Sequence, residues 1–330
     1  MTDLRIGVIG AARIAPSALI RPARRVPGAV VTAVAARDHS RAEAFAAKHG
    51  VPRVHASYDD LVDDPEIDAI YNPLPNGLHA EWTLKAIAAG KHVLCEKPFT
   101  ANADEAEKVA DAADASDRVV MEAFHYRYHE LARRIRTLVH DGSLGEITAV
   151  RAWLCFPLPK FSDIRYNFEL AGGASMDCCY PVHALRTFGP GEPTVVSATA
   201  KRLRGGPVDR AMSATFRYAN GAVGHSYASM WSSRLLRIAA HVDGTKGKLR
   251  ALNFVAPQIY NRLSVTVDGK TSRERVQGEP SYDAQLRAFV AAVNEGKTFP
   301  TTARDAVVTM RLIDDVYRAA GLPLRGTAGA

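Results

Sequence analysis

Cysteine is scarce in this sequence and long apolar runs are missing, which excludes several classes of protein. Four cysteines in 330 residues are too few for a disulfide framework. The pair Cys178-Cys179 with His183 does not have the spacing of a zinc site, so we expect reduced thiols and no bound metal. No apolar stretch reaches the roughly 20 residues of a membrane-spanning helix, so we expect no membrane partner.

The patterns of an export signal and of a nucleic-acid binder are also missing. An expected strand follows Thr2-Asp3 directly, without a charged segment and an apolar core before it, so we expect a cytoplasmic protein. The formal net charge of +7 comes from scattered lysines and arginines. The densest basic clusters (residues 21–25, 133–136 and 201–204) contain no interleaved aromatic residues, so we expect no nucleic-acid partner.

The composition that remains, 47% hydrophobic and 23% charged, is that of a globular protein long enough for two cores. In the first third of the chain, strands alternate with helices, which predicts a parallel sheet with right-handed crossovers. The expected strands span residues 4–9, 29–36, 53–56, 67–71, 92–95 and 118–123. We therefore expect a first domain over residues 1–123.

Long alternating strands replace this rhythm beyond about residue 145. Asn220-Gly221 and Asp268-Gly269 are typical hairpin turns. The expected strands span residues 146–156, 194–202, 211–218, 222–231, 235–243 and 248–254, and two amphipathic helices follow. The predicted class is α/β, with a second, α+β domain over residues 124–330 that has a large, mostly antiparallel open sheet. We expect the C-terminal helix to pack back on an earlier element.

A loop of small residues follows the first expected strand. Gly10 to Ala15 approaches the dinucleotide-binding pattern G-x-G-x-x-G/A, with Ala12 at the second glycine position. Gly10 would make the tight turn, Ala12 would admit a pyrophosphate, and Ala15 would let helix pack on strand. A match of this kind also arises by coincidence, but the strand–turn–helix setting predicts a Rossmann domain. Its cofactor would lie against Gly10, Ala12, Arg13 and Ile14 at a helix N-terminus.

The tip of the second expected strand bears on the identity of the cofactor. An acidic residue there would bind the ribose 2′-hydroxyl of NAD, whereas an arginine can pair with the 2′-phosphate of NADP. Arg37 at the tip, with Arg41 one helical turn beyond, favours NADP, while Asp38 keeps NAD open. Both arginines could equally be solvated charges at a helix end.

Residues 92–98 combine a strand of buried length with a charged pair. Pro98 cannot continue a central strand, so the chain leaves the sheet at Glu96-Lys97. Because ligands bind outside the carboxyl ends of parallel strands, Lys97 would face a crevice. The alternative is a surface lysine on a turn. A lysine desolvated beside a cofactor has a lowered pKa and can hydrogen-bond an alcohol or a carbonyl oxygen.

Five motifs occur in the order typical of one family. They are Gly10-x-Ala12-x-x-Ala15, Leu74-Pro75-Asn76 with His79, Glu96-Lys97-Pro98, Met121-Glu122-Ala123 and Gly172-Gly173-Ala174-x-x-Asp177. Over nearly its whole length the chain resembles the glucose–fructose oxidoreductase/inositol dehydrogenase (Gfo/Idh/MocA) family. It is most similar to the branch with dimeric dihydrodiol dehydrogenase and NADP-dependent xylose dehydrogenase.

The resemblance implies a set of site residues and an assembly. It implies a cis Lys97–Pro98 peptide bond, Glu96 near the nicotinamide ribose, and Lys97 and Tyr180 at the reacting oxygen of the substrate. Leu74, Asn76 and His79 are implied as further cofactor contacts. It also implies a homodimer through the C-terminal sheet.

Pro181 makes this chain differ from the family, because Tyr180 stands three rather than four residues beyond Asp177. A proline inside a helix costs about 3 kcal/mol, so we expect Asp177 near the N-cap and Pro181 in the first turn. Tyr180 and His183 would then share a face. We interpret Lys97 and Tyr180 as an acid/base pair and His183 as a relay or substrate contact. His183 could equally be a satisfied histidine between the domains.

These patterns predict an NAD(P)-dependent dehydrogenase or reductase, with NADP favoured. Its substrate would be a sugar, polyol or cyclic diol oxidised or reduced at one carbon. Arg165 and Asp177 are weaker candidates for substrate contacts. Trp153, Phe156, Phe161 and Trp231 would supply apolar walls for a flat diol.

Two alternatives stay open. The first is a cofactor-binding regulator without catalysis, which the shifted Asp177 favours and Lys97 disfavours. The second is an NAD-dependent glycosidase, which Arg37 disfavours.

Overall fold

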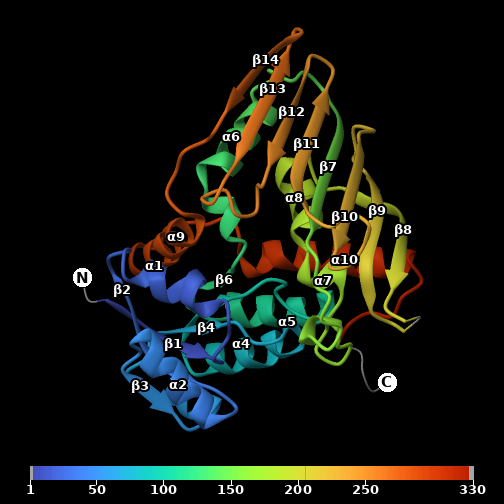
Figure 1. Cartoon of the computed structure of the whole chain (residues 1–330). Helices are drawn as coiled ribbons and strands as arrows, with labels where there is room; N and C mark the ends of the chain where they lie inside the picture. Colours follow the sequence, from blue (N-terminus) through green and yellow to red (C-terminus); the bar gives the residue numbers. More distant parts are fainter. Residues whose placement is uncertain (1–2, 205, 327–330) are drawn as a thin grey trace. The chain divides into compact units, whose positions relative to one another are not determined.

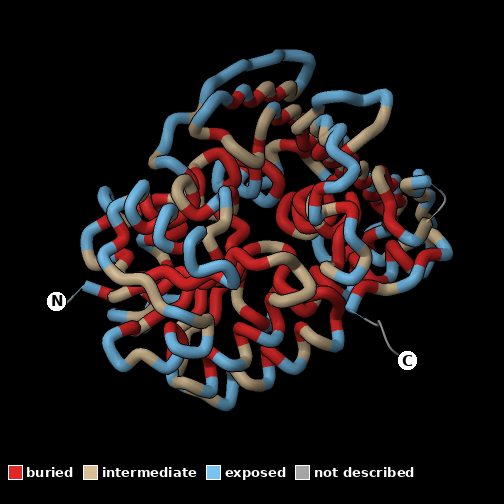
Figure 2. The backbone as a smooth tube through the Cα atoms, turned by 60° about the horizontal axis from the view of Figure 1, so that its bottom comes forward, coloured by how far each residue is buried: buried red, intermediate tan, exposed pale blue. Residues whose placement is uncertain are grey.

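The computed structural model describes residues 3–204 and 206–326, which form two compact units (Figure 1). Unit 1 combines the chain up to His125 with Tyr282–Val307. Unit 2 combines Tyr126–Ser281 with the residues from Val308 onward. In each unit the central strands are largely buried, whereas the outermost strands of unit 2 and the outer loops are more exposed (Figure 2). No helix in the described ranges is long and apolar enough to cross a membrane.

Unit 1 contains, among its described residues, a six-stranded sheet in the order β3-β2-β1-β4-β5-β6. Its strands are β1 (Leu4–Ile9), β2 (Ala29–Ala35), β3 (Arg53–His55), β4 (Ala69–Asn72), β5 (His92–Cys95) and β6 (Val120–Glu122). All neighbouring pairs are parallel, and the strand order reverses between β1 and β4. The doubly wound sheet predicted from the sequence is confirmed. Its strands are almost uninterruptedly apolar because both faces are covered.

Side chains cap three of the helices of unit 1. The helices of this unit are α1 (Arg21–Ala23), α2 (His39–His49), α3 (Tyr58–Asp63), α4 (His79–Ala88), α5 (Ala103–Asp114) and α9 (Ser281–Glu295). Asn102 caps α5, because its side chain accepts a hydrogen bond from the Glu105 main-chain N–H at 2.9 Å. Asp38 and Ser57 cap α2 and α3 in the same way.

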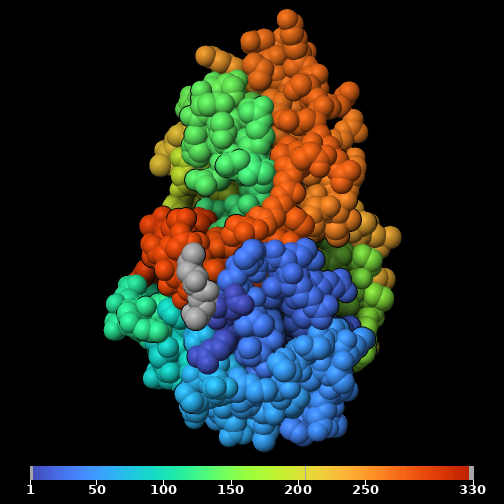
Figure 3. All heavy atoms as spheres, turned by 90° about the vertical axis from the view of Figure 1, so that its left-hand side faces the viewer, coloured from blue at the N-terminus to red at the C-terminus, as the bar shows by residue number. Residues whose placement is uncertain are grey.

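Two arginines join the later segment of unit 1, Tyr282–Val307, to its earlier residues. Arg25, just after α1, forms a two-pronged ion pair with Asp283 of α9, both distances being 2.6 Å. Figure 3 shows α9 in orange-red beside the blue α1 region. Arg304, in the first turn of α10 (Ala303–Ala319), binds three carboxylates of α5 at 2.6–2.7 Å. The boundary between the units falls inside α10, and the division into domains 1–123 and 124–330 stays a prediction.

Unit 2 contains, within the described ranges, an eight-stranded sheet in the order β14-β13-β12-β11-β7-β10-β9-β8. Its strands are β7 (Ile147–Cys155), β8 (Thr194–Arg202), β9 (Asp209–Arg217), β10 (Val223–Ser229), β11 (Arg237–Gly244), β12 (Gly247–Leu252), β13 (Arg262–Val267) and β14 (Lys270–Glu274). Only β7 and β10 pair in parallel among these neighbours. The mostly antiparallel sheet is therefore confirmed, with hairpins at Asn220-Gly221 and Asp268-Gly269.

Helices cover one face of this sheet. They include α6 (Glu130–His140), α7 (Ala174–Asp177) and α8 (Tyr180–Phe188), and α8 packs on β7 and β10. Alternate residues of β9 and β10 are buried toward these helices, while Ser213 and His225 are exposed on the other face. On that open face the Arg237 guanidinium lies 3.9 Å from the ring centre of Trp153.

Candidate active site

The sequence-predicted cofactor residues of unit 1 gather along one edge of its sheet. Because all strands run parallel, the loops that follow β1, β2, β4 and β5 emerge on the same side. These loops contain, in strand order, Gly10, Arg37, Leu74 and Lys97. The strand order reverses between β1 and β4, and ligands of doubly wound sheets bind at such a switch point.

The glycine loop has the geometry that its sequence predicts. Gly10 has φ +101°, which a residue with a side chain rarely adopts, and a Cβ there would lie 3.0 Å from Leu74 Cδ2. Ala15 is fully buried where the following helical segment begins, and Arg13 and Ile14 are exposed. The loop therefore presents its main chain at a helix N-terminus, where a pyrophosphate can be held.

Asp38 is engaged in local structure at the tip of β2. Its carboxylate accepts hydrogen bonds from the Ser40 hydroxyl at 2.7 Å and the Arg41 main-chain N–H at 3.4 Å. The Ser40 bond is the main cause of the lowered pKa of Asp38. The side chains of Arg37 and Arg41 are exposed beside it. The carboxylate of Asp38 is thus a helix cap with an exposed arginine on each side of it.

His79 ties two loops of this edge together. It is 1% exposed, and its Nδ1 and Nε2 lie 2.7 Å and 2.8 Å from the carbonyl oxygens of Pro98 and Leu74. Burial lowers the pKa of His79 to about 4, against the smaller effects of the two carbonyls. The ring therefore holds the loops that contain Leu74 and Pro98 in place. Asn76 begins the short helical turn that precedes α4. A direct cofactor contact of His79 stays a prediction.

Glu96 and Lys97 follow β5 at the same edge. Glu96 is 8% exposed, and its Oε1 accepts a hydrogen bond from the Tyr71 hydroxyl at 2.8 Å. Burial raises the pKa of Glu96, although Lys97 and Tyr71 oppose that shift. Lys97 is half-buried, and the Lys97–Pro98 peptide bond is cis, as the resemblance implied.

Two residues of this edge, Tyr71 and Tyr282, were missed in the sequence, and a third, Glu122, was named there only as part of a motif. Tyr71 donates a hydrogen bond to Glu96. Burial and, as a smaller cause, the charge of Glu96 raise the pKa of Tyr282. Glu122 is fully buried at the end of β6, opposite Cys95. Tyr71 could have been selected from the sequence, because it stands next to Asn72 at the end of an apolar strand. No sequence pattern indicates that Tyr282, from the far end of the chain, lies near Glu96.

The candidate residues of unit 2 lie on and before α8. This helix begins at Tyr180 with Pro181 in its first turn, as predicted. The expectation that Asp177 lies at its N-cap is wrong, because Cys179 holds that position and Asp177 ends the separate helix α7. Gly173, with φ +148°, starts α7, since its carbonyl accepts the Asp177 N–H at 2.9 Å.

The two weaker substrate candidates lie together. Arg165 Nε is 3.7 Å from Asp177 Oδ1, and a second guanidinium nitrogen is 3.3 Å from Asp163 Oδ1. A Cβ on Gly172 would lie 2.5 Å from the Arg165 carbonyl oxygen, so glycine permits this close approach. The arrangement places a partly exposed guanidinium between two carboxylates.

Tyr180 and His183 are buried on α8, with 6% and 0% of their surface exposed. Tyr126, which the sequence analysis did not select, lies beside both. Its hydroxyl is 2.7 Å from His183 Nδ1, and its ring centre is 5.8 Å from that of Tyr180. The sequence signal for Tyr126 was its place in an aromatic-rich stretch directly after β6. Since Lys97 belongs to unit 1 and Tyr180 to unit 2, their pairing stays a prediction.

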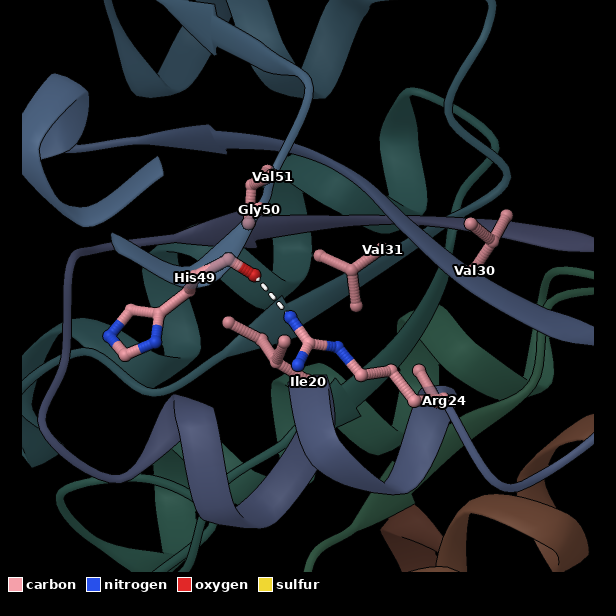
Figure 4. A pocket seen from close by; sticks show the side chains of 8 residues that line it. Ile20, Arg24, Val30, Val31, His49, Gly50 and Val51 are labelled. Atoms are coloured by element: carbon pink, nitrogen blue, oxygen red, sulfur yellow. Dashed lines mark hydrogen bonds between the residues drawn. The ribbon is translucent and has the colours of Figure 1, made fainter. Parts of the chain in front are cut away.

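A pocket elsewhere in unit 1 is a poor candidate for the cofactor. It is lined by Ile20, Arg24 and the start of β2, and the Arg24 guanidinium donates to the His49 carbonyl at 2.6 Å (Figure 4). It lies near the amino end of β2, away from the carboxyl edge. Within the described ranges, no cluster of three or more His, Cys, Asp or Glu side chains could hold a metal ion.

Comparisons with known proteins agree with the five sequence motifs. The model for "Oxidoreductase family, NAD-binding Rossmann fold" matches residues 4–124, and that for "GFO/IDH/MocA C-terminal domain" matches residues 132–250. D-xylose 1-dehydrogenase (NADP(+)) 2 of Haloferax volcanii is 38% identical over 96% of this chain and 97% of that protein. Trans-1,2-dihydrobenzene-1,2-diol dehydrogenase of Mus musculus is 34% identical over 69% of this chain and 68% of that protein.

A solved structure agrees over the same length. The crystal structure of a 3-ketoreductase from Actinomadura kijaniata with NADP and TDP-benzene has a TM-score of 0.89 and 28% identity. The match covers 96% of this chain and 98% of that one.

Proposed function

Because the chain belongs to the Gfo/Idh/MocA oxidoreductase family, we propose that it is an NADP-dependent dehydrogenase or reductase of a sugar, polyol or cyclic diol. The observation that carries this proposal is Lys97 at the carboxyl end of β5, half-buried beside the Glu96–Tyr71 pair. A cation at this edge can hydrogen-bond the reacting oxygen of an alcohol or carbonyl. The relatives named above support both the substrate class and the cofactor.

Gly10, Ala12, Arg13 and Ile14 would hold the pyrophosphate of the cofactor. The cradle fits, because a side chain at residue 10 would meet Leu74. Arg37 and Arg41, both exposed at the tip of β2, would bind the 2′-phosphate of NADP. The loop with Leu74 and Asn76, which His79 positions, and Glu96 would hold the nicotinamide ribose. Bound nicotinamide supplies the carbon that exchanges a hydride with the substrate.

Lys97 and Tyr180 would manage the single proton of the reaction. In oxidation, the hydroxyl proton of the substrate passes to one of them while its carbon loses a hydride, and a carbonyl forms. In reduction the same groups return the proton to the oxygen. His183 would act as a relay or hydrogen-bond the substrate, and Arg165 with Asp177 would contact its other hydroxyl groups.

The proposal is tested by titrating the protein with NADPH and with NADH, then following nicotinamide absorbance with candidate substrates. The panel contains aldoses including xylose, inositols, keto sugars and dihydrodiols. We expect tighter binding of NADPH and turnover of at least one sugar. Tight binding without turnover on the panel would favour a cofactor-binding regulator. Retention of NAD through purification would favour the glycosidase.

A homodimer through the open face of the unit 2 sheet and a cytoplasmic location belong to the same proposal. Trp153, Tyr227 and His241 lie half-buried on that face, and aromatic side chains are common in interface cores. Sedimentation of the wild type and of Trp153→Glu tests the interface, and a monomeric variant is expected. The four cysteines, all in the described part of the chain, are buried and form no disulfide, as is usual in reducing compartments.

A further inference from the structure

A buried chain of hydrogen bonds in unit 2 joins Tyr126, His183 and Thr187. Tyr126 lies directly after the first unit, while His183 and Thr187 lie one turn apart on α8. The three residues have 0%, 0% and 5% of their surface exposed. The Tyr126 hydroxyl is 2.7 Å from His183 Nδ1 and 3.1 Å from Thr187 Oγ1. Thr187 Oγ1 in turn donates to the His183 carbonyl oxygen at 2.9 Å.

Counting protons along this chain favours one direction for each bond. The single proton of Thr187 Oγ1 can go to the His183 carbonyl or to Tyr126, and in the second case the 2.9 Å contact with the carbonyl lacks a proton. With that proton on the carbonyl, Thr187 accepts from Tyr126 and, at 3.4 Å, from Arg127. Tyr126 also has one hydroxyl proton. If it pointed at His183, the oxygens of Tyr126 and Thr187 would face each other at 3.1 Å without a proton between them. If it points at Thr187, every bond is made and His183 Nδ1–H donates to Tyr126.

We infer that Tyr126 and Thr187 hold neutral His183 as the Nδ1–H tautomer, which makes Nε2 a proton acceptor. Tyr126 and Thr187 are therefore positioning residues for His183. The use of this tautomer rests on the proposed function: Nε2 can take a proton or accept a hydroxyl hydrogen bond but cannot donate one. His183 was interpreted as a proton relay or a substrate contact. With this tautomer, a relay through Nε2 begins with His183 acting as a base.

The tautomer is measured by nitrogen NMR of the full-length chain labelled with ¹⁵N in the histidine rings, at pH 8. This pH lies well above the ordinary histidine pKa of about 6.5. The His183 signals are those that vanish in His183→Gln. We expect Nδ1 to show the signature of a protonated ring nitrogen and Nε2 that of a bare one. A protonated Nε2 in the wild type would overturn the inference.

Thr187→Val gives a second, opposite prediction. This near-isosteric change removes the acceptor of the Tyr126 proton, which should then turn to His183 Nδ1 and convert the ring to the Nε2–H tautomer. Tyr218→Phe is the matched control, since it removes another buried hydroxyl bond to α8, from Tyr218 to the Leu185 carbonyl at 3.0 Å. The control should leave the tautomer unchanged. An unchanged tautomer in Thr187→Val would overturn the inference.

Turnover separates this inference from the proposed function. In Thr187→Val we expect kcat to fall about tenfold or more with little change in KM, as for loss of a proton-transfer group. The expected tautomer in a wild-type protein that turns over no substrate would refute the proposed function alone. The opposite tautomer in an active enzyme would refute the inference alone.

Discussion

At the scale of single residues, two lysines at opposite ends of β5 have different surroundings, and we therefore expect different roles for them. Lys91, before the strand, is 7% exposed and donates to the carbonyl oxygens of Asp64 and Ile67 at 2.7 and 2.8 Å. Lys97, after the strand, is half-buried next to Glu96. The first lysine satisfies main-chain acceptors. The second lies where the proposed substrate would bind.

Lys97→Met should lower kcat by about 10²–10⁴-fold, the usual loss of an acid/base group, with the Kd for NADPH changed little. Steady-state assays and a fluorescence titration measure the two quantities. Lys91→Met is the matched control: it should keep kcat and lower the free energy of unfolding by about 1–3 kcal/mol, because buried carbonyls lose their donor. Loss of NADPH binding in Lys97→Met would assign a structural role to Lys97.

His79 should make stability depend on pH. Its pKa is lowered from 6.5 to about 4 by burial, so the unfolded chain binds a proton more readily than the folded one. The free energy of unfolding should therefore fall as pH falls from 7 toward 4, by up to about 3 kcal/mol from this residue.

The pH dependence of His79 is measured by urea unfolding of the wild type and His79→Gln at pH 7 and 5. The variant should lose less stability between these values. His39→Gln, at an exposed position, is the control. An equal loss in wild type and His79→Gln would mean that folding leaves the pKa of His79 unchanged. A larger loss in His79→Gln would mean that His79 stays charged in the folded protein, between its two carbonyl neighbours.

At the scale of elements, the junction between β2 and α2 places an acidic helix cap next to two exposed arginines. Its sequence, Arg37-Asp38, was compatible with NADP or NAD. Asp38 caps α2 through Oδ1, which accepts from residues two and three positions further along the chain. The cap is therefore a local contact, and the preference for NADP rests on the exposed Arg37 and Arg41.

Arg37→Asp should raise the Kd for NADPH by about 10–100-fold and that for NADH little, because a charge-assisted bond contributes about 1.5–3 kcal/mol. Titration with both cofactors measures the two constants. Lys48→Asp, near the other end of α2, changes the net charge equally and serves as the control. A similar loss in the control would point to long-range attraction instead of contact with the 2′-phosphate.

Helices α7 and α8 show where local rules succeed and fail. Pro181 dictates that α8 begins close to it, and the structure confirms this. The sequence did not predict α7, whose start depends on Gly173. A Cβ on Gly173 would clash with Asp209 and approach the Tyr317 hydroxyl oxygen to 2.7 Å. Those neighbours come from distant parts of the chain, so no local pattern places Asp177 correctly.

At the scale of the whole chain, the C-terminal segment is held by a buried ion pair in unit 2. Arg325 and Asp209 are both 0% exposed, and Arg325 Nη2 lies 3.0 Å from Asp209 Oδ1. Arg325 Nε also donates to the Gly172 carbonyl at 2.8 Å, and Tyr317 donates to Asp209 at 2.9 Å. These bonds connect the last described residues to the loop that precedes α7.

Arg325→Met should lower the free energy of unfolding by about 3–5 kcal/mol, because it leaves the Asp209 charge buried without its guanidinium. Thermal or urea unfolding measures the loss. Arg318→Met, which removes an exposed arginine of α10, should change stability by less than about 1 kcal/mol. A small loss in Arg325→Met would show that Asp209 is satisfied by its remaining donors.

The sequence by itself determined the α/β class, the doubly wound sheet, the mostly antiparallel second sheet and the family. These follow from short-range periodicity and turn residues, and from motifs that are contiguous in the chain. Only the tertiary structure showed that Tyr71 binds Glu96, that Asp177 ends a separate helix and that Tyr126 bonds His183. Side-chain partners of this kind lie far apart in sequence in most cases, and folding alone brings them within hydrogen-bonding distance.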